Sequence, residues 1–260
     1  METLSTTKTR YKLFANGISG STLKIIAIVS MTFDHAGVIL LEKLMQVRGF
    51  ADITTATQFD TFIEMNQLLF STYTLLRIIG RLAFPIFCFL IVQGFIHTHN
   101  TKKYQLRILL FALLSEIPFD LSFFQSLFYW EYQNIFFTLF FGILSMHCIK
   151  IAIDKKEWHI LIRVLLGSLS VGACLFAASI FKCDYGVYGV LTIILMYLFR
   201  EWKLLSVGLG CFALGSIPPF LSLIPIYYYN GEKGINMKWL FYWFYPVHIL
   251  LFYLLSYFIN

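Results

Sequence analysis

Charged residues are scarce in this sequence of 260 residues. Asp, Glu, Lys and Arg together make up 13% of it, whereas a typical soluble domain carries about 25%. A chain with half the usual charge cannot cover a globule of this size with a water-soluble surface. Intrinsic disorder is excluded as well, because disordered chains combine low hydrophobicity with high net charge.

Cysteine patterns typical of metal sites are also absent. The five cysteines are Cys88, Cys148, Cys174, Cys183 and Cys211, and they form no CxxC pair. Most of them lie inside apolar runs, which favours small packed side chains. The first 21 residues lack the apolar core and cleavage site of a signal peptide. We expect no bound metal.

Apolar residues, in contrast, fill the chain. They make up 58% of it, and the mean hydropathy is +0.74. Since a helical span needs roughly 20 apolar residues, the sequence predicts an all-α, polytopic transmembrane bundle with about eight spans. A tail over 1–21 precedes a single transmembrane domain over 22–260. The spans are expected near 22–42, 75–98, 104–122, 133–152, 160–181, 185–200, 203–228 and 239–259.

Two further predictions concern how these spans are arranged. The apolar run 67–97 is too long for one straight span, which predicts a kink at Pro85 or an interfacial segment before Arg77. Most Lys and Arg residues fall in loops on one side if the N-terminus is cytoplasmic. We therefore expect both termini in the cytoplasm. The net charge of +6 then reflects topology, and no nucleic-acid partner is expected.

Ionisable residues inside apolar runs are the strongest functional signal, because each is costly in hydrocarbon unless it faces a partner or a cavity. His35 can act as a general base toward a thioester, or carry an acyl group covalently. The alternative is a hydrogen bond that joins two helices. Asp34 is adjacent on the helix and points elsewhere, so we expect it to pair with an arginine.

Arg77 and Arg81 are four residues apart and would share one helix face, where they could bind phosphate or carboxylate. The alternative is a structural ion pair with Asp34 or Glu116. Further polar residues are expected in the outer halves of the spans, as a polar chamber open to the extracytoplasmic side. They are Glu116, Asp120, Asn134, Asp184, Asn230 and His248. Asp184 and Asn230 could instead cap helices or shape turns.

Seven separated blocks of the chain resemble the TraX family of membrane proteins. They are LKIIAIVSMTFDHAG, RIIGRLAFPIFCFLIVQGF, KYQLRILLFALLSEIPFDL, NIFFTLFFG, DYGVYGV, YYYNGEKG and FYWFYPVHIL. The TraX family is named for a factor required for acetylation of F-type pilin, and it is distantly similar to transmembrane acyltransferases. The resemblance implies a bacterial inner-membrane protein that uses acetyl-CoA. It matches His35 to an essential histidine of the transmembrane acyltransferases. Arg77 and Arg81 match the basic residues of those proteins more loosely, because the basic residues often lie closer together there.

The resemblance thus implies acetyl transfer from cytosolic acetyl-CoA to a hydroxyl or amine of an envelope glycan or pilin-like acceptor. His35 and Asp34 would be catalytic, with His35 as base or acetyl carrier and His248 as a proton relay. Arg77 and Arg81 would bind the donor or the acceptor. The alternatives are a transporter or flippase for an anionic or lipid-linked substrate, and a non-catalytic scaffold. Membrane lipid is an expected partner, and homo-oligomerisation is left open.

Overall fold

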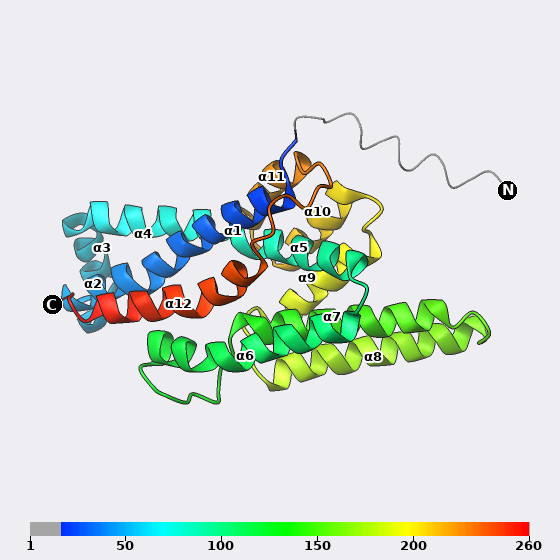
Figure 1. Cartoon of the computed structure of the whole chain (residues 1–260). Helices are drawn as coiled ribbons and strands as arrows, with labels where there is room; N and C mark the ends of the chain where they lie inside the picture. The colour runs from blue at the N-terminus through cyan, green and yellow to red at the C-terminus, as the bar shows by residue number, and fades with distance from the viewer. Residues whose placement is uncertain (1–16, 260) are drawn as a thin grey trace.

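The structure is a computed structural model that describes residues 17–259 (Figure 1). All of its regular secondary structure is helical. In that range the only β-type contacts are two isolated bridges. The elements are α1 (Gly20–His35), η2 (Ala36–Leu41), α2 (Glu42–Val47), η3 (Phe50–Asp52), α3 (Ala56–Met65), α4 (Gln67–Gly80), α5 (Ala83–His97), α6 (Thr101–Phe124), α7 (Ile135–Asp154), α8 (Ile160–Ile180), α9 (Gly186–Leu198), α10 (Lys203–Ala213), η4 (Pro218–Ser222), α11 (Leu223–Tyr227) and α12 (Lys238–Ser256). The all-α prediction is confirmed.

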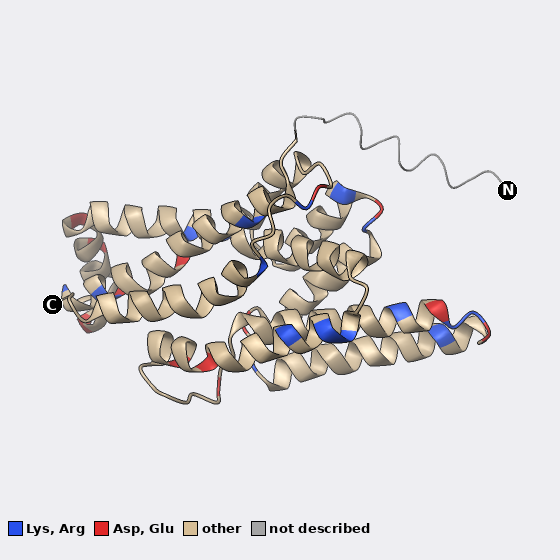
Figure 2. Ribbon diagram, viewed as in Figure 1, with Lys and Arg blue, Asp and Glu red and all other residues tan. Residues whose placement is uncertain are grey.

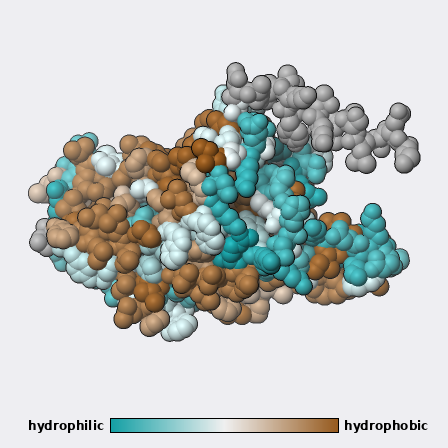
Figure 3. Space-filling model, viewed as in Figure 1, coloured by the Kyte–Doolittle hydropathy of each residue, from teal (hydrophilic) through white to brown (hydrophobic). Residues whose placement is uncertain are grey.

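Five helical stretches in the described chain are long and apolar enough to cross a membrane. They are Gly20–Val47, Gln67–His97, Ile135–Asp154, Ile160–Ile180 and Lys238–Ser256. Large apolar side chains point outward along them, as Leu161, Leu165 and Leu169 do on α8. Apolar residues also cover much of the face in Figure 3. Because such a surface is stable only in lipid, the chain is a multi-pass membrane protein.

The run 67–97 is interrupted as expected, and the break falls at Arg81 and Leu82. Pro85 is the physical cause. Its nitrogen has no hydrogen to donate to the carbonyl of Arg81, four residues earlier, and its ring would clash with that carbonyl. As a result α4 ends at Gly80, α5 begins at Ala83, and Arg81 lies at the junction.

Residues 203–228 do not form the single span that hydropathy predicts. α10 has 11 residues and ends before Gly215, which has a φ of +67°. Pro218 and Pro219 prevent the helix from continuing, and the chain returns through η4 and α11. The ammonium group of Lys203, at the start of α10, donates to the carbonyls of Tyr227 and Tyr229 at 2.9 and 3.0 Å. The segment is therefore a re-entrant helical hairpin.

This hairpin changes the predicted topology. α1 and α12 run in the same direction, since Lys24 lies over the ring of Phe241 and His35 contacts His248. Figure 1 shows both helices running toward the end that carries α2 and α3. Ser256 thus lies at the opposite end of the bundle from Gly20. The sequence predicts eight spans with both termini on one side, and the parallel directions of α1 and α12 do not fit that arrangement within residues 17–259. The number of spans and the side that each terminus faces stay predictions.

Candidate functional site

The first part of the site is the contact between α1 and α4, where the two backbones come very close. The hydroxyl of Ser30 on α1 donates to the carbonyl of Ile79 on α4. Gly80 lies directly against the side chain of Asp34, and a Cβ at position 80 would overlap it. Glycine at this position therefore lets α4 approach the polar face of α1.

This close approach forms the partly buried ion pair that the sequence left as an alternative. Arg77 Nη1 lies 2.7 Å from Asp34 Oδ2, with 24% and 18% of the two side chains exposed. The second oxygen of Asp34 is enclosed and has no hydrogen-bond partner in the described chain. Asp34 thus pairs with an arginine on another helix, as expected. Its negative charge neutralises that of Arg77, one of the two arginines predicted to bind an anion.

His35 forms the second part of the site, at the point where α1 widens into the π-helix η2. Its Nδ1 lies 2.7 Å from Nε2 of His248 on α12, and the two rings stack with centroids 4.9 Å apart. His248 Nδ1 lies 2.7 Å from the carbonyl oxygen of Phe244. These two hydrogen bonds link His35 to the backbone of α12 in one chain.

The chain of hydrogen bonds determines where the protons are. A carbonyl can only accept, so His248 Nδ1 carries the hydrogen. With both rings neutral, as their position away from water favours, His248 Nε2 must then accept from His35 Nδ1–H. His35 Nε2 is left with its lone pair, and no described residue donates to it. One nitrogen of His35 is fixed and the other is available.

Aromatic side chains surround this histidine pair. Phe123 of α6 and Tyr245 of α12 present ring edges to His35 at centroid distances of 5.8 and 5.9 Å. Ser122 donates to the carbonyl of Ile249 at 3.0 Å, which fixes α6 beside α12 at the same level. The imidazole rings are thereby held in one orientation.

Arg81 differs from Arg77 in having no carboxylate partner among residues 17–259. Its Nη1 lies 3.4 Å from the hydroxyl of Tyr185, a long and weak hydrogen bond. Tyr185 stacks on Phe84, with centroids 3.9 Å apart. Because its charge is not paired, Arg81 is the arginine that could bind an anionic group.

Asp184 lies in the turn before α9, next to Tyr185. Its carboxylate accepts from the hydroxyl of Tyr132 at 3.2 Å. Its backbone N–H donates to the Gln133 carbonyl at 2.8 Å, and its own carbonyl accepts from the Thr138 hydroxyl. Burial raises the pKa of Asp184 to about 6. These contacts join the loops that precede α7 and α9, which is the turn-shaping role kept open from sequence.

Glu116, Asp120 and Asn134 lie together near the start of α7. Asn134 caps α7 by accepting from the N–H of Phe136 at 3.0 Å, and its amide donates to Glu116 Oε2. Asp120 Oδ2 accepts from the N–H of Tyr129 at 2.8 Å. The other oxygen of each carboxylate is enclosed without a hydrogen-bond partner among the described residues.

Asn230 lies apart from this group and takes the turn-shaping role that the sequence kept open as an alternative. Its backbone N–H donates to Ile18 at 3.1 Å, and its side chain accepts from the N–H of Glu232 at 2.9 Å. It therefore shapes a turn at the start of α1, about 16 residues and 24 Å along the helix from His35. The cause is the re-entrant hairpin, which returns the chain to that end.

Some members of the site carry no sequence signal. Tyr185 and Phe123 are ordinary aromatic residues in an aromatic-rich chain, and Gly80 is one of 16 glycines. No group of three or more His, Cys, Asp or Glu side chains within residues 17–259 is arranged to hold a metal ion.

Fold and site together define a multi-pass helical membrane protein with ionisable side chains paired inside its bundle. A sequence model described as TraX protein matches residues 19–256. The chain belongs to the TraX family. It is also similar to the probable fimbrial assembly protein FimC, serogroup H1, of Dichelobacter nodosus, with 27% identity over 260 residues, covering 88% of this chain and 92% of the relative. No solved structure matches.

Proposed function

We propose that the protein is an integral membrane acetyltransferase. It would move the acetyl group of cytosolic acetyl-CoA to a hydroxyl or amine on a surface glycan or pilin-type peptide at the extracytoplasmic side of the bacterial inner membrane. The observation that carries the proposal is the free Nε2 of His35, in a ring whose other nitrogen is fixed by His248. Membership of the TraX family, and a relative named for fimbrial assembly, support acetyl transfer and a pilin-like acceptor.

In this mechanism His35 is the general base. Its Nε2 takes the proton from the acceptor hydroxyl or amine, whose oxygen or nitrogen attacks the thioester carbonyl carbon. The C–S bond breaks, and His35 returns the proton to the sulfur, which leaves as the free thiol of coenzyme A. While His35 is charged, its hydrogen bond to His248 becomes charge-assisted and stronger. His248 is thus a positioning residue, in place of the proton relay expected from sequence.

The arginines have separate roles in this proposal. Arg81, which has no carboxylate partner within residues 17–259, offsets negative charge on the thioester oxygen or binds a phosphate of the donor or acceptor. Arg77 and Asp34 hold α4 against α1 through their ion pair, and so place Arg81 relative to His35. The sequence predicts that both arginines bind ligand, whereas this proposal assigns ligand binding to Arg81 alone.

A transporter or flippase is the second candidate, favoured by one observation. Glu116 and Asp120 each keep an enclosed carboxylate oxygen without a hydrogen-bond partner among residues 17–259, and such groups often line a substrate path. This function would move substrate across the membrane without consuming thioester.

The deciding experiment measures thiol release. Protein in lipid nanodiscs is mixed with acetyl-CoA and a membrane extract that supplies glycan, pilin and lipid acceptors. We expect free coenzyme A from the wild type and none from His35→Ala, while His97→Ala, an exposed histidine at the end of α5, keeps the wild-type rate. Absence of thiol release from wild type with all acceptors refutes the acetyltransferase. Mass spectrometry of envelope glycans and surface peptides then identifies the acceptor by loss of one acetyl group.

The proposed orientation has its own test. With the start of α1 in the cytoplasm, the loop before α3 and the end of α12 face outward. Single cysteines at Thr54 and Phe258 should label from outside the cell, and a cysteine at Glu232 only after the membrane is opened. Labelling of positions 54 and 258 from opposite sides would contradict the parallel arrangement of α1 and α12.

A further inference from the structure

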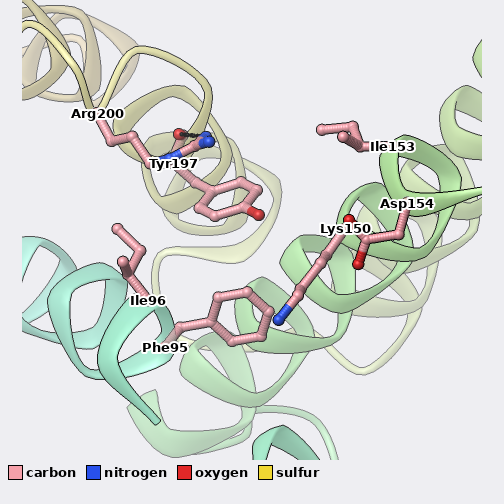
Figure 4. Close-up of a pocket in the computed structure, with 7 residues that line it drawn as sticks. All are labelled: Phe95, Ile96, Lys150, Ile153, Asp154, Tyr197 and Arg200. Atoms are coloured by element: carbon pink, nitrogen blue, oxygen red, sulfur yellow. Dashed lines mark hydrogen bonds between the residues drawn. The ribbon is translucent and has the colours of Figure 1, made fainter. Parts of the chain in front are cut away.

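A second polar feature lies far from His35, at the end of the bundle where α5, α7 and α9 meet (Figure 4). It is a pocket of about 200 Å³, and its lining includes Phe95, Lys150, Asp154, Tyr197 and Arg200. α9 connects it to the site, since Tyr185 beside Arg81 precedes this helix and Arg200 follows it. The 13 residues of α9 span about 20 Å.

The pocket has an aromatic wall with an unused hydroxyl. Phe95 and Tyr197 are 2% and 5% exposed, and their rings meet edge to face with centroids 5.5 Å apart. In Figure 4 the Tyr197 hydroxyl points into the pocket, and it forms no hydrogen bond with a residue in the described range. Because a tyrosine hydroxyl can both donate and accept a hydrogen bond, this one is available to a ligand in the pocket.

Positive charge lies beside this wall. The Lys150 ammonium extends toward the ring of Phe95 in Figure 4, and within residues 17–259 it forms no ion pair. The Arg200 guanidinium lies 4.7 Å from the centroid of the Tyr197 ring and 3.6 Å from Glu201, so it holds the ring and is partly neutralised. Asp154 is the acid of the lining. Basic residues also gather nearby, at the starts of α6 and α8 (Figure 2).

We propose that this pocket binds the nucleotide end of the acyl donor, with a phosphate on Lys150 and the polar edge of the base at the Tyr197 hydroxyl. An ammonium recognises phosphate through charge-assisted hydrogen bonds, and a tyrosine hydroxyl can donate to or accept from the polar edge of a base. The pocket is smaller than the roughly 300–1,000 Å³ of sites that enclose whole ligands. It therefore takes one end of the donor, and the rest extends along α9 toward His35. The assignment rests on the proposed use of acetyl-CoA.

The test measures equilibrium binding to the full-length protein in phosphatidylcholine nanodiscs, with coenzyme A and adenosine 3′,5′-bisphosphate as probes. Lys150→Gln should weaken both by about tenfold, the effect of one hydrogen bond to a charged group. Lys156→Gln removes the same charge from the neighbouring turn and should bind as wild type. Asp154→Asn should bind severalfold tighter, a gain that misfolding cannot produce.

Other outcomes separate the competing explanations. Equal binding by wild type and Lys150→Gln, while thiol release continues, overturns the pocket assignment and leaves the acetyltransferase standing. Binding that depends on Lys150 without thiol release by any acceptor refutes the acetyltransferase and retains the pocket. A lipid phosphate has the same chemistry as the nucleotide phosphate. If phosphatidylglycerol nanodiscs abolish coenzyme A binding in wild type, and Lys150→Gln no longer responds to that lipid, the pocket is a lipid site and the nucleotide assignment is wrong.

Discussion

Replacing His248 by phenylalanine tests the reasoning about the histidine pair. Phenylalanine keeps the ring and its packing against Phe244 and Phe252, but it removes the acceptor that lies 2.7 Å from His35 Nδ1. The His35 N–H then has no partner in a water-poor site, which costs about 1–3 kcal/mol. The imidazole ring of His35 can also flip, or its proton can move from Nδ1 to Nε2, the nitrogen that must act as the base.

If the same free energy is added to the activation free energy of the reaction, the rate of acetyl transfer should fall by about 5- to 150-fold. His248→Gln is the matched control, because its amide oxygen can accept from His35 Nδ1–H. This variant should keep most of the rate. The assay is thiol release at saturating acetyl-CoA, with thermal unfolding of each variant measured in the same detergent. The KM for acetyl-CoA should not change, since the role proposed for His248 is to position His35 and not to bind the donor.

The protonation pattern can be observed without any acceptor. With 15N-labelled histidine, the wild-type His35 should show a protonated Nδ1 and an unprotonated Nε2, and His248→Phe should show both tautomers. A wild-type rate for His248→Phe, together with an inactive His35→Ala, would refute the positioning role. So would equal losses in the phenylalanine and glutamine variants.

Three further predictions concern the helices around the site. Gly80→Ala places a methyl group into Asp34 and should lower the free energy of unfolding by about 1–3 kcal/mol, whereas Gly172→Ala, in open space on α8, should leave the melting temperature unchanged or raise it. Asp34→Asn strands the positive charge of Arg77, so the Asp34→Asn/Arg77→Met double variant should melt higher than Asp34→Asn alone; additive losses would contradict a direct pair. Burial raises the pKa of Asp184 to about 6, so its contribution to stability is complete below its ordinary pKa and is lost as pH rises through 6. Unfolding at pH 5 and 7.5 should show this difference in wild type and not in Asp184→Asn.

The polar residues of the site could be found from sequence because an ionisable side chain in an apolar run is conspicuous. His35, Asp34 and Arg77 stand out on that basis, and an ion pair between Asp34 and Arg77 is one of the two interpretations that the sequence allows. Their other contacts could not be assigned. His35 and His248 are 213 residues apart in the chain, and Tyr185 looks like many other aromatic residues until it is placed beside Arg81.

Scarcity of charge indicated by itself that lipid is the main solvent. Apolar runs of roughly 20 residues then indicated helices, because a membrane-spanning strand of a closed barrel needs only about 10 residues. Hydropathy could not decide whether residues 203–228 form one straight span, since a helical hairpin that turns back can be as apolar as a span. Only the tertiary structure showed that this segment turns back at Gly215, that α1 and α12 are parallel, and that two distant histidines are hydrogen-bonded to each other. These features depend on which faces of the helices pack together, and that choice is made by contacts between residues far apart in the chain.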